Sequence, residues 1–593
     1  MTAIDRFDPR LADRAVGALR AFNEAGVLSP ADVHVARRVT ELAGENDEWV
    51  ALATALAVRG PRLGHVYVDI ATIRETVTVD TDEPVDLTAL PWPPADAWLE
   101  RLQASDLVAV GENGPPDCPL RLVDTALYLD RYWREERQVA ADLIALRDGP
   151  PVPLNEPLLT DGLTRLFQGD EPDNRQRAAA ETAVRSRFAV VAGGPGTGKT
   201  TTVARILALL FEQSPEPPLV ALAAPTGKAS ARLTEAVHEE AAKLEITDDT
   251  RTRLEGLEAS TLHRLLGWRP GTHSRFRHDR SNRLPHDVVI VDETSMVSLS
   301  LMARLVESVR PEARLILVGD PGQLTSIEAG AVLGDIVGTD TAPGIVVLDR
   351  VHRFGGAIAR VAEAIRHGNA DATIEALADV TWIPVDPAAP ASQAALAPVH
   401  AGAIECFRAV TEAAQAGEAA RAIEALGAFR VLCAHRQGPY GVTGWTSRIE
   451  SWLAAELDTF APDGDWYAGR PLLVTENDYG LGLYNGDTGV VIANDGHLTA
   501  AFERRGEVAE FSPTRLAAVE TVYAMTVHKA QGSQFDTAAV LLPDPTSPIL
   551  TRELLYTAVT RARRHLVLMG TEEAVRSAVG RPVARASGLR WRL

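Results

Sequence analysis

VVAGGPGTGKTT, residues 190–201, is the stretch from which the architecture of this chain can first be inferred. An apolar run, Phe188 to Ala192, leads into it and is typical of a buried parallel strand. A helix-like run, TTVARILALLFEQ, follows it. A strand, a glycine-rich loop and a helix in this order form a phosphate-binding loop, because backbone N–H groups and the helix N-terminus converge on the phosphates. The sequence therefore predicts a domain that holds a nucleoside triphosphate.

The loop and its helix supply groups for the phosphates and for a metal ion. We expect the Lys199 ammonium to reach the β- and γ-phosphates and the Thr200 hydroxyl to bind Mg²⁺. The other residues expected to surround the phosphates are Gly193, Gly194, Pro195, Gly196, Thr197, Gly198 and Thr201. The predicted cofactors are accordingly ATP and Mg²⁺.

Two further apolar runs place acidic and polar residues beside the phosphate loop. The run Asp287 to Val291 is followed by Asp292, expected to hold the Mg²⁺ through water, and by Glu293, expected to orient and deprotonate the attacking water. A solvated turn is the alternative for two adjacent acids. The run ARLILVGD ends at Asp320 and places Gln323 near the γ-phosphate. Strands that alternate with helices predict a doubly wound, parallel α/β core.

Composition sets limits on the rest of the chain. Its 593 residues, 46% hydrophobic and 23% charged, are typical of a globular protein of about four domains. We find no run of 18 apolar residues and no apolar leader, and the three widely spaced cysteines fit free thiols, so we expect a cytoplasmic protein. The net charge of −21 is uneven, because residues 1–150 hold 26 acidic and 15 basic side chains. A locally positive groove elsewhere stays compatible with nucleic acid.

Eight segments in order resemble the motif series of the superfamily 1 helicases. They are GGPGTGKTT, APTGKASARL, STLHRLLG, VDETSM, GDPGQLTS, HRF, TVHKAQGSQFD and YTAVTRARR. The resemblance implies two RecA-like motor lobes that close on ATP. Arg353 and Arg561 are then expected to stabilise the transferred phosphoryl group; a surface salt bridge and a general basic patch are the respective alternatives. Gln176 is expected to read the adenine, and Gln534 stands where these motors usually carry a glutamate that meets the ribose.

The same resemblance implies a track for single-stranded nucleic acid across both lobes. Such tracks combine polar contacts to phosphates with stacking of bases, and they read no sequence. The expected contacts are Pro225, Thr226, Lys228 and His263 in the first lobe, and Thr526, His528 and Gln531 in the second. The choice of DNA over RNA rests on the resemblance alone.

Segments outside the motifs narrow the resemblance to the RecD family, the α-subunits of the RecBCD helicase–nuclease (exodeoxyribonuclease V). These segments are residues 50–70, 120–140, 429–450 and 469–491. The expected domains, in chain order, are a mostly helical docking domain (1–150), a first motor lobe (151–345), and a second motor lobe (346–468 and 521–593) with an SH3-like β-barrel inserted in it (469–520). Short β-type runs broken by ND, NGD and NDG turns predict the barrel, and an edge extension of the main sheet is the alternative.

The RecD resemblance implies an ATP-driven 5′→3′ single-stranded DNA translocase and helicase that acts at duplex ends in recombinational repair. Its expected partners are RecB-like and RecC-like subunits in a heterotrimer, without a membrane. Besides the acids assigned to ATP, the sequence offers no evident cluster of metal-binding acids with a lysine, so we expect any nuclease in a partner. Two alternatives stay open: a stand-alone 5′→3′ helicase, and a structural or regulatory subunit whose ATPase has little role.

Overall fold

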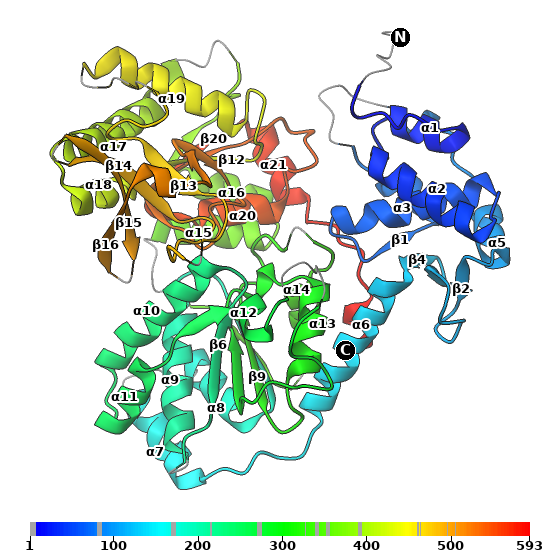
Figure 1. Ribbon diagram of the computed structural model, residues 1–593, viewed down its shortest axis with the longest axis horizontal. Coiled ribbons are helices and arrows are strands. Elements are labelled where there is room, and N and C mark those ends of the chain that lie inside the picture. The colour runs from blue at the N-terminus through cyan, green and yellow to red at the C-terminus, as the bar shows by residue number, and fades with distance from the viewer. Residues whose placement is uncertain are drawn as a thin grey trace.

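The computed structural model has three regions: an N-terminal region, a first lobe that carries the phosphate loop, and a second lobe (Figure 1). The residues that the structure describes are 8–79, 86–167, 174–213, 216–269, 275–326, 328–338, 343–350, 356–389, 394–458, 460, 462, 464–478, 480–494, 496–504 and 506–593. Among them, no helix is long and apolar enough to span a membrane.

The first lobe is built on a wholly parallel sheet in the order β10-β5-β9-β8-β6-β7. Its strands are β5 (Phe188–Gly193), β6 (Val220–Ala224), β7 (Ala259–Thr261), β8 (Val288–Val291), β9 (Arg314–Gly319) and β10 (Ile345–Leu348). Its helices include α7 (Glu156–Leu166), α8 (Arg175–Arg185), α9 (Lys199–Glu212), α10 (Gly227–Lys243), α11 (Asp248–Glu255), α12 (Leu262–Leu266), α13 (Leu299–Ser308) and α14 (Val332–Val337).

Both faces of this sheet are covered, as the strand sequences predict. Val288 and Ile290 of β8 pack in the core beneath α9 and α10, whereas Val289 and Val291 pack in the core beneath α13. A strand that is buried on both faces needs a continuous apolar run, which is what the sequence shows.

The second lobe repeats this architecture with a parallel sheet in the order β11-β20-β19-β12-β18. Its strands are β11 (Thr381–Ile383), β12 (Phe429–Cys433), β18 (Ala524–Thr526), β19 (Phe535–Leu541) and β20 (Ala562–Met569). One core contains residues of α15 (Gly356–Arg366), α16 (Ala370–Leu377), α20 (Arg552–Val559) and α21 (Glu572–Gly580). The other contains residues of α17 (Ala397–Gln415), α18 (Ala419–Leu426) and α19 (Val442–Glu456). Two parallel, helix-covered sheets confirm the predicted α/β class.

A separate antiparallel sheet occupies the span in which the barrel was predicted. Its strands are β13 (Pro471–Val474), β14 (Thr488–Asn494), β15 (His497–Arg504), β16 (Glu507–Phe511) and β17 (Val519–Thr521), in the order β16-β15-β14-β13-β17. It is therefore not an extension of the parallel sheet. Its two outer strands do not pair with each other among the described residues, so closure into an SH3-like barrel stays a prediction.

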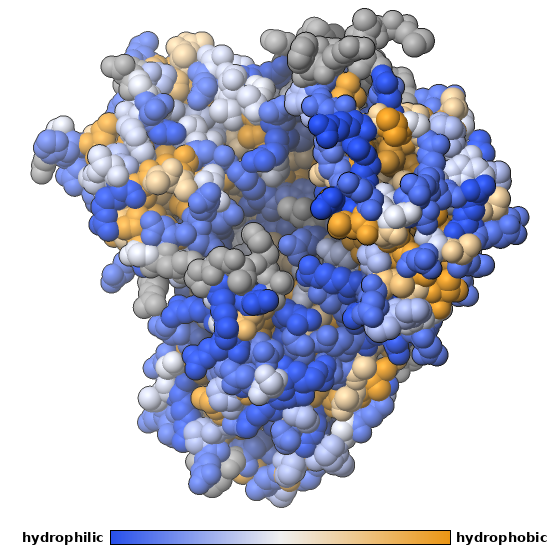
Figure 2. Space-filling model, turned by 45° about the vertical axis from the view of Figure 1, so that its right-hand side comes forward, coloured by the Kyte–Doolittle hydropathy of each residue, from blue (hydrophilic) through white to orange (hydrophobic). Residues whose placement is uncertain are grey.

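The N-terminal region is helical, as predicted, and it also contains a small sheet. Its helices include α1 (Gly17–Glu24), α2 (Pro30–Ala43), α3 (Glu48–Arg62), α4 (Ile73–Thr76), α5 (Ala95–Ala104) and α6 (Asp130–Arg147), and its strands are β1 (Tyr67–Asp69), β2 (Val108–Val110), β3 (Leu120–Val123) and β4 (Ala126–Leu129). Strands this short show little periodicity, which is why the sequence did not reveal them. Apolar areas lie on the surface of this region in Figure 2. Among its described residues, the large apolar side chains that are exposed are those of Val16, Val35, Leu42, Leu63 and Val110.

The chain returns from the second lobe to the N-terminal region in a C-terminal segment, residues 581–593. Helix α22 (Leu589–Arg592) packs against α6, beside which the C-terminus lies in Figure 1. Buried Glu136 of α6 accepts hydrogen bonds from the Gly588 N–H at 2.7 Å and from Arg592 Nε at 3.0 Å. Helix α6 also packs through Val139 and Leu143 into the core of the first lobe, so it joins the N-terminal region, the first lobe and the C-terminal segment.

Candidate active site between the two lobes

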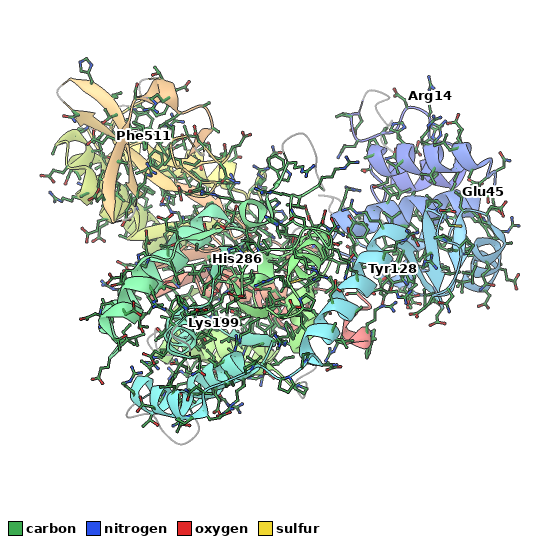
Figure 3. All side chains as sticks on the ribbon, turned by 60° about the horizontal axis from the view of Figure 1, so that its bottom comes forward. Arg14, Glu45, Tyr128, Lys199, His286 and Phe511 are labelled. Carbon is green, nitrogen blue, oxygen red and sulfur yellow. The ribbon has the colours of Figure 1, made fainter. Side chains whose placement is uncertain are left out.

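The phosphate loop has the predicted geometry of strand β5, glycine loop and helix α9, and Figure 3 marks its Lys199 in the first lobe. Gly196 and Gly198 have φ angles of 80° and 83°, in the left-handed region that side chains rarely adopt. A Cβ at Gly198 would also overlap the amide of Gln176, whose Nε2 donates to the Thr197 carbonyl at 3.0 Å. Gln176 thus lies against the loop, beside the site where a bound nucleotide is expected.

Lys199 points back across the mouth of the loop. Its Nζ donates to the carbonyl oxygens of Gly193 at 2.7 Å and Gly194 at 3.0 Å. The Thr197 hydroxyl also donates to the Gly194 carbonyl, at 2.9 Å, and thereby closes the loop. The ammonium is consequently held where the terminal phosphates would enter, and phosphate oxygens can replace the two carbonyls. Half-buried Thr200 follows in the first turn of α9.

Asp292 and Glu293 lie directly after β8, at the carboxyl edge of the sheet. Burial and the neighbouring Glu293 raise the pKa of Asp292 above its ordinary value, and the Lys199 charge opposes this shift. Glu293 has a φ angle of 51°, a strained conformation for a residue with a side chain, and its N–H donates to Asp292 Oδ1 at 2.8 Å. A half-buried carboxylate at the carboxyl edge of the sheet suits a hard, oxygen-binding cation such as Mg²⁺, because a cation there would hold Asp292 ionised.

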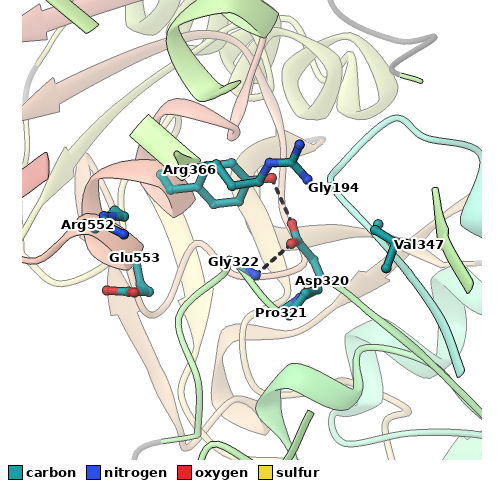
Figure 4. Close-up of a pocket in the computed structure, with 10 residues that line it drawn as sticks. Gly194, Asp320, Pro321, Gly322, Val347, Arg366, Arg552 and Glu553 are labelled. Atoms are coloured by element: carbon teal, nitrogen blue, oxygen red, sulfur yellow. Dashed lines mark hydrogen bonds between the residues drawn. The ribbon is translucent and has the colours of Figure 1, made fainter. Parts of the chain in front are cut away.

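The loop after β9 connects the first lobe to the second. Buried Asp320 accepts from the Gly322 N–H at 2.9 Å and from the Tyr556 hydroxyl of α20 at 3.1 Å (Figure 4). It also accepts from Gln323 Nε2 at 3.1 Å. The next residue of the loop, Leu324, donates its N–H to the Thr557 hydroxyl at 2.8 Å. Gln323 is therefore held against Asp320, in the loop that bonds to the second lobe.

Arg561 enters this site from the second lobe. Its guanidinium donates to the Thr557 carbonyl at 3.0 Å, to the Ser533 carbonyl at 3.3 Å and to the Thr560 hydroxyl at 3.3 Å. Burial lowers the pKa of Arg561 below its ordinary value, and the charges of Glu293 and Asp320 of the first lobe partly oppose this shift. The guanidinium is thus held by its own lobe and lies within electrostatic reach of the acids of the other. Arg353 lies outside the described residues.

A cavity of about 240 Å³ separates the lobes at this point (Figure 4). The first lobe contributes Gly193, Gly194, Asp320, Pro321, Gly322 and Val347 to its wall, and the second contributes Arg366, Arg552, Glu553 and Tyr556. Sequence reasoning assigned no role to Tyr556 or Arg366. Tyr556 belongs to the recognised YTAVTRARR segment, but the reach of its hydroxyl depends on how the lobes sit together. Arg366 lies outside every motif segment, so no sequence pattern marked it as a residue of the site.

Two of the predicted nucleic-acid contacts of the first lobe, Thr226 and Lys228, lie at the start of α10, where a loop of the second lobe packs. Lys228 Nζ donates to the Gly486 carbonyl at 2.8 Å, and burial lowers the pKa of Lys228 to about 7. The Tyr484 ring packs against Gly227, where a Cβ would overlap it. Thr226 caps α10 by accepting from the Ala229 N–H at 3.2 Å. The loop between β13 and β14 therefore covers the position where we expect single-stranded nucleic acid to bind.

The other predicted contacts are distributed over both lobes. Gln531 Nε2 donates to the Leu324 carbonyl at 2.8 Å, which joins the lobes. In the first lobe, Pro225 is half-buried after β6, and the centroid of the His263 ring lies 5.9 Å from that of Phe276. In the second lobe, His528 is half-buried, and the Thr526 hydroxyl accepts from the Lys529 N–H at 3.2 Å. Gln534 accepts from Arg563 Nε at 3.5 Å. Their roles toward nucleic acid and ribose stay predictions.

Comparison with known families agrees with this geometry. The profile of the RecBCD enzyme subunit RecD N-terminal domain matches residues 24–128, that of an AAA domain matches residues 171–387, and that of the UvrD-like helicase C-terminal domain matches residues 521–569.

Proteins similar to this chain over its length carry the same family name. The RecBCD enzyme subunit RecD of Mycobacterium tuberculosis is 51% identical over 597 residues, which cover 99% of this chain and 98% of that protein. The protein of the same name from Mycolicibacterium smegmatis is 50% identical and covers 97% of this chain and 99% of its own length. The ATP-dependent RecD2 DNA helicase of Deinococcus radiodurans is 31% identical over 81% of this chain and 61% of its own length. This chain belongs to the RecD family.

Proposed function

We propose that this chain is the 5′→3′ single-stranded DNA translocase and helicase subunit of a RecBCD-type helicase–nuclease that processes duplex ends in recombinational repair. The observation that carries the proposal is the junction of the lobes at the phosphate loop, where Asp320 of the first lobe accepts from Tyr556 of the second. Hydrolysis at such a junction can change the relative position of the lobes, and that movement is what a stepping motor requires.

The chemistry proposed for the site is phosphoryl transfer from ATP to water. The phosphate loop and Lys199 hold the triphosphate, and Thr200 and Asp292 would hold Mg²⁺, which would supply positive charge to the phosphates. Glu293 orients the attacking water and takes its proton. Gln323 responds to the γ-phosphate. The assigned residues that complete the site are Arg353 and Arg561 at the transferred group, Gln176 at the adenine and Gln534 at the ribose.

The nucleic-acid track is proposed to cross both lobes, past the start of α10 in the first lobe and past residues 526–531 in the second. Thr226 and Lys228 contact phosphates in the first lobe, with Pro225 and His263 beside them. The contacts proposed for the second lobe are Thr526, His528 and Gln531. Polar contacts to the backbone fit a motor that moves along any sequence.

Residues 1–150 are proposed to dock a RecC-like subunit, with a RecB-like subunit completing the heterotrimer and supplying any nuclease. Exposed apolar side chains support this, because such residues on a surface fit a protein partner. Leu42, whose exposed fraction is 70%, is a suitable test. Leu42→Asp should abolish co-purification with the two partners, whereas Leu219→Asp, on the first lobe with an exposed fraction of 50%, should not.

A stand-alone helicase is the second candidate, because a protein named ATP-dependent RecD2 DNA helicase is also similar to this chain, although its 31% identity is lower than the 51% and 50% of the RecBCD enzyme subunits. Unwinding by the purified chain, with Lys199→Gln as the inactive control, separates the two on duplexes with a 5′ or a 3′ single-stranded tail. Opening of the 5′-tailed duplex alone supports a 5′→3′ motor that needs no partner. DNA-stimulated ATPase without unwinding supports a motor that needs its complex. Opening of the 3′-tailed duplex alone contradicts the proposed direction.

A further inference from the structure

Arg366, the last residue of α15, belongs to the wall of the cleft at the phosphate loop. It lines the cavity that Gly193 and Gly194 border, and also an adjoining cavity bordered by Pro195 and Thr197. Figure 4 shows its guanidinium on the side of the cavity where Gly194 lies. A residue of the second lobe thus lines both cavities that border residues 193–197 of the phosphate loop.

The contacts of Arg366 leave its guanidinium suited to bind an anion. Its ion pair with Glu363 has a separation of 3.3 Å, and the exposed fractions of the two side chains are 32% and 54%. Exposed pairs of this kind are weak and exchange readily. Arg552, the other arginine of the cavity, is differently engaged, because its Nε donates to the Val579 carbonyl at 2.9 Å.

The position of Lys199 indicates which part of a nucleotide would meet Arg366. The Lys199 ammonium rests on the Gly193 and Gly194 carbonyls, and in a phosphate loop this lysine binds the β- and γ-phosphates. The cavity beside Gly194 is therefore at the terminal end of the triphosphate. A planar guanidinium matches phosphate oxygens with two parallel hydrogen bonds.

We propose that Arg366 contacts the terminal phosphate of bound ATP and so lets the second lobe distinguish ATP from ADP. This inference rests on the proposed ATP site and adds a residue to it. Arg366 is well placed to transmit the difference, because Ile358, Val361 and Ile365 of α15 share a core with α20. Helix α20 carries Tyr556, which bonds Asp320 of the first lobe. A displacement of Arg366 on phosphate binding would consequently be transmitted through α15 to α20, the helix whose Tyr556 bonds the first lobe.

The test compares the affinities of the full chain for ATPγS and for ADP, both with Mg²⁺, in wild type, Arg366→Ala, Arg366→Lys and Arg360→Ala. Arg360 is the matched control on the same helix, since it pairs with Asp379 at 2.6 Å and has an exposed fraction of 61%. We expect Arg366→Ala to weaken ATPγS binding about tenfold or more, and to change ADP binding by less than about twofold. Arg366→Lys should fall between, because it keeps the charge and loses the two parallel bonds.

Several results would overturn the inference. One is an equal loss of affinity for both nucleotides in Arg366→Ala, which would indicate a structural role. Another is wild-type affinity for ATPγS in that variant. Binding of neither nucleotide to the wild-type chain would overturn the inference together with the proposed site. Unwinding by the same preparations is a separate readout, because an ATP-specific effect of Arg366 together with opening of the 3′-tailed duplex alone would support the phosphate contact and contradict the proposed direction of the motor.

Discussion

The Tyr556 hydroxyl of the second lobe donates a hydrogen bond to Asp320 of the first lobe across 3.1 Å, although the two residues are 236 positions apart in the chain. Burial and the Asp320 charge raise the pKa of Tyr556 well above its ordinary value, so the hydroxyl stays a donor at neutral pH. Asp320 also accepts from Gln323, the residue expected to respond to the γ-phosphate. The bond therefore links the second lobe to the nucleotide site through a single carboxylate.

Tyr556→Phe should weaken the coupling between the lobes without unfolding either of them. Asp320 retains its bonds from Gly322 and Gln323, so no buried charge is left unsatisfied and the loss of stability should be about 1 kcal/mol. If the bond acts during turnover, a loss of that size lowers kcat about fivefold. DNA-stimulated ATPase assays measure this. Tyr467→Phe is the control, because it removes a 2.9 Å bond to Tyr523 within the second lobe. Equal kcat values in the two variants would contradict a role in coupling.

Arg561→Ala should lower ATP turnover by about a thousandfold and change KM little, because the guanidinium acts mainly on the transferred phosphoryl group. Arg564→Ala is the control in the same basic run. Arg564 has an exposed fraction of 73% and lies 3.8 Å from Asp536. Steady-state kinetics of both variants decide between a catalytic arginine and a general basic patch. Similar, small losses in both would favour the basic patch.

Lys228→Ala should weaken single-stranded DNA binding to a similar degree for all sequences and reduce the slope of log K against log salt by about 0.7, as expected for one lost phosphate contact. Lys243→Ala is the matched control, since Lys243 lies at the other end of α10 and pairs with Glu240 at 2.9 Å. Fluorescence anisotropy over a salt series measures the slope. An unchanged slope in Lys228→Ala would remove this residue from the track.

Tyr484→Ala should have the opposite effect and strengthen DNA binding. Its ring holds the loop between β13 and β14 against Gly227, and the Gly486 carbonyl of that loop occupies Lys228. Without the ring, the loop should compete less with a phosphate for the Lys228 ammonium. Weaker binding in Tyr484→Ala would instead indicate that the ring itself contacts DNA, as aromatic side chains do when bases stack on them.

The features that the sequence predicted are those set by short segments. The phosphate loop is one contiguous run, and Asp292 and Asp320 follow apolar strands whose burial on both faces is legible in their composition. The features that it did not predict depend on contacts between distant segments. Lys228 meets Gly486 across 258 positions, and no local pattern reports which loop covers a residue from another lobe. Arg366 was missed for the same reason, because its cavity is made by two lobes.

Acidification should loosen the C-terminal segment from the N-terminal region. His65 Nδ1 accepts a hydrogen bond from the Ala586 N–H at 3.2 Å, and only the neutral imidazole can accept there. Burial, with the charges of Arg59 and Arg585, lowers the pKa of His65 to about 4, against about 6.5 in an unfolded chain. The folded state thus favours the neutral ring, so its stabilisation is present above pH 6.5 and is lost as the pH falls toward 4.

A local measurement suits this prediction, because a chain of several lobes does not unfold in a single two-state step. The Val66 N–H donates to the Ala586 carbonyl at 2.7 Å and reports on the same junction. Its hydrogen-exchange protection, corrected for the intrinsic pH dependence of exchange, should fall between pH 7 and pH 4.5 in the wild type. The fall should be much smaller in His65→Asn, whose amide oxygen can accept without titrating. His278→Asn, at a half-buried histidine of the first lobe, should behave as wild type. An equal fall in all three would assign the pH dependence to other groups, such as the carboxyl of Glu136 that binds Gly588 and Arg592.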